Sequence, residues 1–180
     1  MKSVKTDDEI SHYINAFERT DKAVRAIRDY IENNENLSEY DIAEQLEKEF
    51  KRFGAKGLSF KSIVAKDKNS ALAHYSKCSK DEILKDGSLV LIDCGAYYEQ
   101  GLATDITRVF VKGKPSELQR KVYTTVLKMF LNAYNHESQD GKYVGYNIDE
   151  LARKIYSENE IDGFEFNHGL GHGIGVSVHE

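Results

Sequence analysis

The chain has 180 residues, with 30 acidic and 25 basic side chains, a formal net charge of −5, two cysteines and one proline. No apolar run approaches the ~18 residues that cross a bilayer, so a membrane-spanning protein is excluded. The mild acidity and the lack of any block of Lys and Arg argue against nucleic-acid binding. The charged first residues lack the apolar segment of a secretory signal, and two cysteines are too few for a disulfide scaffold, so we expect a soluble protein of the reducing cytoplasm.

The first third of the sequence predicts two amphipathic helices. Residues 6–9 (TDDE) form a capping-box pattern, and apolar residues at helical spacing follow until the asparagines at 33–34, which predicts a helix over about 7–33. A second helix is expected to begin near Ser38, because apolar residues recur along one face from there, and to stop at Gly54.

The middle of the chain predicts strands. Residues 58–76 contain β-branched and aromatic runs on both sides of a polar turn at 66–69, a pattern typical of two paired strands. The apolar run 88–95 (SLVLIDCG) predicts a buried strand that delivers Asp93 to an interior site. After a turn, the β-branched residues from Thr104 to Val111 predict a strand that pairs with it as a hairpin.

The second half of the chain repeats the order of the first. A long helix is expected after the Pro-Ser pair at 115–116, another helix near Asn147, and then extended chain to the end. The order helix, helix, extended chain, histidine thus occurs twice, ending at His74 and at His179. This favours a structural duplication, with a first repeat over about 6–112 and a second that begins at about 116 and occupies the rest of the chain to 180. No linker or low-complexity tract marks an internal domain boundary.

Three of the six histidines lie in the glycine-rich tail FNHGLGHGIGVSVHE. His168 and His172 would form a two-ligand metal face on a helix, but the alternating glycines cost a helix about 1 kcal/mol each, so extended backbone is expected. Both side chains would then project from one face, and the bare face would let a ligand lie against the backbone. Tight packing of a glycine-rich strand is the alternative, and for His74 an ordinary core or surface position is the alternative.

Two aspartates, Asp93 and Asp105, are expected on adjacent strands. Burying ionised carboxylates there is costly, and a divalent cation would relieve the cost, so with the histidines they suit Mn²⁺, Fe²⁺, Co²⁺ or Zn²⁺. A salt bridge to Arg108 is the alternative for Asp105, and a strand-end turn cap is the alternative for Asp93. Cys94 should point to the opposite face as a small core residue.

Two segments together resemble a known family. DCGAYYEQGLATDITRVF (93–110) is similar to the D-x-G…D-[IV]-T-R hairpin of the metallopeptidases with the pita-bread fold, and HGLGHGIGVSVHE (168–180) is similar to their glycine-rich histidine strand. His168 is typical of the aminopeptidase P and prolidase branch. The resemblance covers nearly the whole chain and implies an α+β fold of the creatinase/aminopeptidase type. This fold is a duplicated helix-helix-sheet unit, here with a truncated second half and without the N-terminal domain of that branch.

The resemblance implies a role for six side chains. Three would bind metal, with Asp93 on one ion, Asp105 bridging two and His172 on the second. The other three would position the substrate, orient the scissile carbonyl and stabilise the tetrahedral intermediate: His74, His168 and His179.

The implied cofactor is a pair of divalent metal ions. Manganese is the usual metal of the family, and cobalt, zinc and iron are the alternatives. Such ions lower the pKa of a bridging water towards ~7 and supply a hydroxide nucleophile. The implied reaction is that of an aminopeptidase that hydrolyses the N-terminal Xaa-Pro bond, so the expected partners are peptides with proline in the second position. Neither nucleic acid nor a membrane is expected as a partner. A homodimer is compatible with the resemblance.

The chain also departs from the family pattern. Its hairpin is one residue longer between the aspartates than expected. The two remaining ligands of the family are glutamates downstream of the histidine strand, so this chain alone is expected to lack appreciable activity. The alternatives are an Xaa-Pro dipeptidase (prolidase), a metal-free creatinase-like hydrolase, or a non-catalytic pita-bread module that binds peptides or proteins. The intact Asp93, Asp105 and His172 favour an enzyme.

Overall fold

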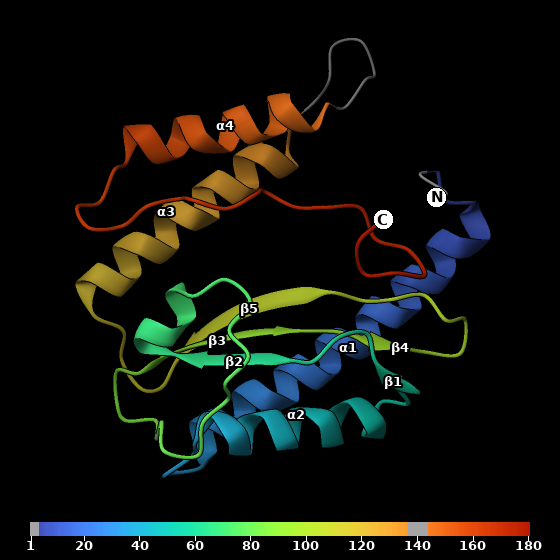
Figure 1. Cartoon of the computed structure of the whole chain (residues 1–180), viewed down its shortest axis with the longest axis horizontal. Helices are drawn as coiled ribbons and strands as arrows, with labels where there is room; N and C mark the ends of the chain where they lie inside the picture. Colours follow the sequence, from blue (N-terminus) through green and yellow to red (C-terminus); the bar gives the residue numbers. More distant parts are fainter. Residues whose placement is uncertain (1–3, 137–143) are drawn as a thin grey trace. The chain divides into compact units, whose positions relative to one another are not determined.

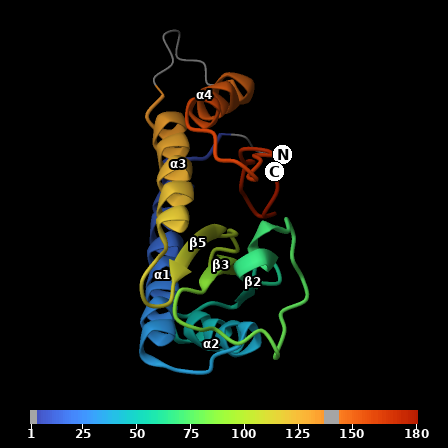
Figure 2. The same cartoon turned by 90° about the vertical axis from the view of Figure 1, so that its left-hand side faces the viewer.

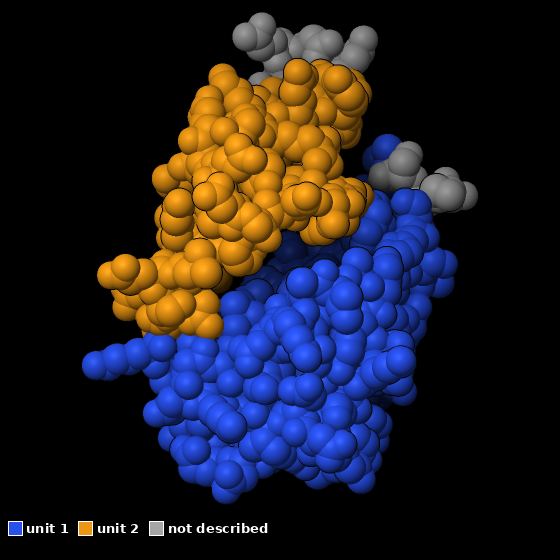
Figure 3. Space-filling model, turned by 60° about the vertical axis from the view of Figure 1, so that its left-hand side comes forward, with its two compact units in different colours: residues 1–114, 172–180 blue, residues 115–171 orange. Residues whose placement is uncertain are grey.

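The computed structural model describes residues 4–136 and 144–180, and the chain divides into two compact units (Figure 3). Residues 1–114 and 172–180 form the first unit, and residues 115–171 form the second. The elements of the first unit, in chain order, are α1 (Asp7–Asn33), α2 (Glu39–Arg52), β1 (Gly57–Leu58), β2 (Ile63–Lys66), the short 3-10 helix η1 (Asp67–Ala71), β3 (Leu89–Cys94), β4 (Ala96–Tyr97) and β5 (Ile106–Val111). The second unit contains α3 (Glu117–Tyr134) and α4 (Gly145–Glu158).

Helices α1 and α2 begin and end where local sequence signals predict. Each starts with a full capping box, in which Thr6 pairs with Glu9 and Ser38 with Asp41. The chain leaves α2 through Gly54, whose φ of +84° suits a residue without Cβ. Both predicted helices of the first third are therefore confirmed, and the predicted span 7–33 matches α1.

The central sheet is antiparallel, with the strand order β2-β3-β5. The predicted hairpin between β3 and β5 is confirmed, and its register sets Asp93 opposite Thr107. The predicted pairing across the turn at 66–69 is wrong, because β2 pairs with β3 and residues 67–71 form η1. The side chain of Asp67 accepts a hydrogen bond from the Leu89 backbone N–H (2.9 Å), which ties this turn to the start of β3. A buried strand such as β3 needs partners on both edges, and β2 supplies the second one.

The main apolar core of the first unit lies between the sheet and its two helices. Side chains alternate along β3, so that Val90, Ile92 and Cys94 are fully buried while the residues between them are only partly covered. Contacts of α1 with β5 and of α2 with β2 place both helices on the sheet (Figures 1 and 2). They bury Ile27 and Phe50, among others, and each such side chain contributes about 1.5–3 kcal/mol. The predicted core position of Cys94 is confirmed.

In the second unit, α3 packs against α4. Ser116 caps α3 with Gln119, as the sequence predicts, and Asn132 Nδ2 donates to the Leu151 carbonyl of α4 (3.1 Å). Helix α4 begins at Gly145, slightly earlier than predicted, and residues 137–143 lie outside the described residues.

Residues 159–180, all of which the structure describes, contain no strand. The predicted glycine-rich strand is therefore wrong for this part of the chain. Within 172–180 the backbone bonds mainly to itself, from Gly175 N to Ser177 O (3.0 Å) and from Glu180 N to Gly173 O (3.1 Å). Glycines supply no side chains that would favour a flat, paired strand over such turns.

Candidate functional site

Asp93 lies on β3 and points away from the core that Cys94 enters. Its Oδ1 accepts a hydrogen bond from Thr107 Oγ1 across the strand pair (3.0 Å), so it does not cap the strand end. Burial is the main cause that raises the pKa of the Asp93 carboxyl above its usual range; the Thr107 hydrogen bond opposes this rise, and the negative charge of nearby Asp105 adds to it. Asp93 and Asp105 are therefore close enough to repel each other.

The position of Asp105, directly before β5, is set by its buried neighbour Thr104. Thr104 Oγ1 accepts from the Ala96 N–H (2.9 Å) and lies 2.8 Å from Thr20 Oγ1 on α1. The Thr104 carbonyl approaches Gly95 so closely that any Cβ at Gly95 would overlap it. Position 95 of the Asp-Cys-Gly sequence therefore requires glycine, because the backbones of the two arms of the hairpin are in contact there.

His172 faces Asp105. The His172 Nε2 atom lies 3.4 Å from Asp105 Oδ2, while its Nδ1 atom lies 3.0 Å from the Gly173 carbonyl oxygen. A carbonyl oxygen can only accept, so the Nδ1 atom of His172 carries a proton, and Nε2 is the ring nitrogen that faces the carboxylate. With Nδ1 hydrogen-bonded to the backbone in this way, Nε2 is the nitrogen that a metal ion would bind. The suggested alternative partner of Asp105, Arg108, instead donates Nη1 to the Thr107 carbonyl (2.8 Å).

Three contacts hold the tail that carries His172 within the first unit. Ala103 N donates to the Gly175 carbonyl (2.9 Å), and Tyr97 Oη donates to the Val176 carbonyl (3.0 Å). Glu180 forms an ion pair with Lys5 (3.1 Å), and its carboxylate lies where a Cβ on Gly175 would be. Lys5 is the main cause that lowers the pKa of Glu180. These contacts bring the end of the chain to the β3–β5 hairpin.

The remaining histidines of the prediction occupy different surroundings. The His179 ring meets the His172 ring edge to face, with centroids 4.1 Å apart. His74 is exposed, and a positive charge on it would act in the direction of a lower pKa for Asp93, with less effect than burial, Thr107 or Asp105. His168 belongs to the second unit, where its Nδ1 lies 2.7 Å from the Gly169 carbonyl and its own carbonyl accepts from Arg153 (3.1 Å).

The donor set suits a divalent ion, although the site is not closed around one. Within residues 4–136 and 144–180, no three Asp, Glu, His or Cys side chains converge tightly enough to hold a metal ion. Two carboxylates that repel each other, and an imidazole whose Nε2 is free to bind, match the ligand chemistry of Mn²⁺, Fe²⁺, Co²⁺ and Zn²⁺. Asp93, Asp105 and His172 therefore fit the implied cofactor as donors.

Sequence reasoning missed two supporting groups. Thr107 orients Asp93, and the Gly173 carbonyl selects the tautomer of His172. The signal for Thr107 was its position two residues after Asp105, on the same face of the strand. No sequence signal reveals the role of the Gly173 carbonyl, because any residue has one.

The model of metallopeptidase family M24 matches residues 11–180 of the chain. The chain belongs to this family. Among curated members, it is 38% identical over 180 residues to an Xaa-Pro dipeptidase of Pyrococcus horikoshii and 36% identical to one of Pyrococcus furiosus. It covers 49% of each of these proteins, so the chain spans about half the length of the curated relatives that it matches.

Solved structures of M24 relatives match the whole chain. The X-Pro aminopeptidase of Thermotoga maritima superposes with a TM-score of 0.89 at 34% identity, over 100% of this chain and 49% of that one. The prolidase of Pyrococcus horikoshii gives 0.87 at 36%, over 100% and 50%. The expected α+β pita-bread fold is thereby confirmed, with this metallopeptidase chain matching about half of it. Among its described residues, no helix is both long and apolar enough to cross a membrane.

Proposed function

We propose that this M24 metallopeptidase is an Xaa-Pro dipeptidase, which hydrolyses the bond between a residue and a following proline. The sequence alone favoured an aminopeptidase with the dipeptidase as its alternative, and the names of the two curated relatives reverse that order. The run of Asp93, Asp105 and His172, in which each side chain is close to the next, supports metal-dependent hydrolysis, and the names of the curated relatives support the dipeptide as substrate.

The chain's own residues divide the work as follows. Asp93 and Asp105 present carboxylate oxygens from neighbouring strands, and His172 presents Nε2 because the Gly173 carbonyl holds its other nitrogen. When bound, two divalent ions, manganese by preference, would activate water and polarise the scissile carbonyl. His179, whose ring contacts that of His172, and His74 would donate to the developing oxyanion. His168 keeps the substrate-positioning role implied by the resemblance, as a prediction.

The test uses the whole protein, for which the activity is proposed, and compares dipeptides such as Ala-Pro with longer Ala-Pro peptides in the presence of Mn²⁺. We expect cleavage of the dipeptide. Asp105→Asn should lower the rate of cleavage by more than about 100-fold. Losing a group that only orients a metal ligand typically costs ~10–100-fold, so a larger loss would indicate a ligand. Asp86→Asn, at an exposed aspartate in the same unit, should leave the rate unchanged. Equal loss in both variants, or no cleavage of any Xaa-Pro substrate, would refute the proposal.

An Xaa-Pro aminopeptidase is the second candidate. Its support is the Thermotoga maritima structure, which carries that name and matches at 34% identity. Both enzymes would use the same donors, so the length of the accepted substrate distinguishes them. Preferred cleavage of Ala-Pro peptides of three or more residues would favour the aminopeptidase.

The activity is proposed for the whole protein. Three protein donors are fewer than a pair of catalytic ions requires, so we expect the 180 residues assayed alone to show no appreciable Xaa-Pro hydrolysis. Robust manganese-dependent cleavage by these 180 residues would contradict this expectation. A non-catalytic peptide-binding module would differ from both enzymes, because Mn²⁺ would then not raise its melting temperature.

A further inference from the structure

Glu39 is a fully buried carboxylate at the first position of α2. An ionised carboxylate is expensive to bury unless several donors surround it. The helix does not need Glu39 for its cap, because the capping box uses the side chains of Ser38 and Asp41. The cap of α2 therefore does not account for the burial of Glu39.

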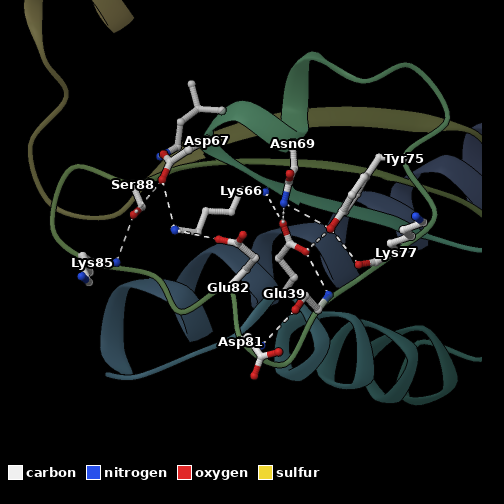
Figure 4. A network of polar contacts seen from close by, with 12 residues as sticks. Glu39, Lys66, Asp67, Asn69, Tyr75, Lys77, Asp81, Glu82, Lys85 and Ser88 are labelled. Atoms are coloured by element: carbon white, nitrogen blue, oxygen red, sulfur yellow. Dashed lines mark hydrogen bonds and ion pairs between the residues drawn. The ribbon is translucent and has the colours of Figure 1, made fainter.

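The four hydrogen bonds that Glu39 accepts, among the described residues, come from one segment, 66–79 (Figure 4). Its Oε1 accepts from Lys66 N (2.7 Å) and Asn69 Nδ2 (3.0 Å). Its Oε2 accepts from Tyr75 Oη (2.8 Å) and Ser79 N (3.0 Å). Hydrogen bonds to an ionised acceptor are roughly twice as strong as neutral ones, so one side chain fastens the start, middle and end of this segment to α2.

The segment that Glu39 fastens carries His74. His74 has a φ of +59°, in the left-handed region, and such a conformation costs a residue other than glycine on the order of 1–3 kcal/mol. It persists only where neighbouring contacts impose it. The next residue, Tyr75, supplies such a contact, because its hydroxyl lies between Glu39 Oε2 and the Lys77 carbonyl, 2.7 Å from the latter. Burial, followed by the hydrogen bond to Glu39, raises the pKa of Tyr75 to about 12, so this hydroxyl keeps its proton at neutral pH.

We propose that Glu39 is a positioning residue for His74. By holding Tyr75 and both ends of segment 66–79, it fixes the backbone that carries His74. The inference rests on the proposed function in so far as His74 orients the substrate. Glu39 itself, buried on α2, touches neither the substrate nor the candidate metal donors.

The direct test is Glu39→Gln in the metal-free 180-residue chain. The amide nitrogen of the glutamine cannot accept a hydrogen bond, and it faces the backbone N–H of either Lys66 or Ser79. At least one of these two backbone hydrogen bonds is therefore lost. We expect the His74 ring signal in histidine-labelled NMR spectra, assigned with His74→Gln, to move or broaden. Amide exchange over 67–79 should quicken by about tenfold or more, while the His172 signal stays unchanged.

Glu49→Gln is the matched control, because Glu49 is also buried on α2 but its carboxylate bonds, among the described residues, to Gln45 and Arg52 of the same helix. It should leave the His74 signal and the exchange of 67–79 as in the wild type. If Glu39→Gln merely lowers the melting temperature, with His74 and segment 67–79 unaltered, Glu39 is only structural and the proposal is overturned.

Tyr75→Phe approaches the same contact from the other side and covers the case in which Glu39→Gln does not fold. It removes one hydroxyl and keeps the bonds of Lys66, Asn69 and Ser79 to Glu39. We expect a smaller shift of the His74 signal in the same direction. An unmoved His74 signal in a folded Tyr75→Phe protein would also overturn the proposal.

A kinetic measurement ties the inference to the proposed activity. In the active peptidase, Glu39→Gln should lower kcat by about tenfold or more with KM within about twofold, whereas Glu49→Gln should change neither. Equal kcat values for the two variants would count against the positioning role. The NMR readout needs no substrate, so a protein that cleaves no Xaa-Pro peptide refutes the proposed function alone and leaves the coupling of Glu39 to His74 to be decided separately.

Discussion

In the metal-free protein, the fold disfavours the ionised form of the Asp93 carboxyl. Its pKa is raised in the folded state, mainly by burial, above the ordinary value of 3.8. A group with a raised folded pKa contributes stability that is fully present below the unfolded pKa and is lost as the pH rises through the folded one. At neutral pH the ionised Asp93 therefore weakens the metal-free fold, and a bound cation would reverse the effect.

Asp93→Asn should therefore stabilise the metal-free protein at neutral pH. The amide keeps an oxygen to accept the Thr107 hydrogen bond, and it removes the repulsion from Asp105. The expected gain is up to about 1 kcal/mol, the size of a cross-strand pair. Thermal unfolding in a chelator at pH 7 measures it, and the advantage should vanish near pH 3, where the Asp93 carboxyl, with its raised pKa, is protonated. A lower melting temperature for Asp93→Asn at pH 7 would contradict this account.

Thr107 gives a second prediction about single side chains. Thr107→Val keeps the shape of the side chain and removes the donor that orients Asp93. Groups that orient a metal ligand typically affect affinity by about 10–100-fold, so the apparent Kd for Mn²⁺, measured by calorimetry, should rise by that factor. Thr107→Ser retains the hydroxyl and should restore most of the affinity. Equal affinities for the valine and serine variants would argue against this role.

Lys112, the residue directly after β5, contacts the C-terminus of α1. Lys112 is 4% exposed, and its Nζ donates to the carbonyls of Ile31 (3.2 Å) and Asn34 (2.7 Å) and pairs with Glu35 (3.2 Å). The last carbonyls of a helix lack partners within it and attract a positive charge. Lys112 thus joins the sheet to the helix through charge as well as through the apolar core.

Lys112→Met should destabilise the protein by about 1–3 kcal/mol, because it leaves buried carbonyls without their donor. The urea midpoint measures the loss. Lys114→Met, two residues further along the chain at an exposed position, should stay within about 0.5 kcal/mol of the wild type. A midpoint for Lys112→Met equal to that of Lys114→Met would show that the contacts of Lys112 contribute nothing.

Helices were more predictable than strand partners in this chain. The starts of α1, α2 and α3 depend on capping boxes that span four residues, so the pattern is visible in a short stretch of sequence. The partner of β2 is β3, which lies more than twenty residues further along the chain. The apolar residues shortly after the turn at 66–69 were an equally plausible partner from the sequence. Pairing between distant strands is decided by burial of the whole sheet, which no short pattern encodes.

The three candidate metal donors lie in one unit although the chain between them passes through the other. Asp93 and Asp105 come from the β3–β5 hairpin, and His172 comes from the tail that returns to the first unit. An ion bound by all three would cross-link the hairpin and the tail. Binding to the folded state alone stabilises the elements that it joins.

Hydrogen exchange should detect this cross-link. With Mn²⁺ present at about 100 times its Kd, binding contributes about 2.7 kcal/mol, so residues 172–180 and the β3–β5 hairpin should exchange more slowly. The amides of α3 and α4 carry none of these donors and should be unaffected. His172→Gln should remove the protection of the tail. Protection spread evenly over both units would contradict a site confined to these donors.

The sequence by itself determined which residues could do chemistry and where most helices begin, since residue identity and capping depend on neighbours only a few positions apart. It also predicted that Asp93 and Cys94 point to opposite faces, because alternation is a property of any strand. Only the tertiary structure decided that Asp105 meets His172 rather than Arg108, that Gly173 selects the histidine tautomer, and that Glu39 fastens the segment bearing His74. These contacts join residues brought together by packing, or depend on backbone atoms that every residue shares.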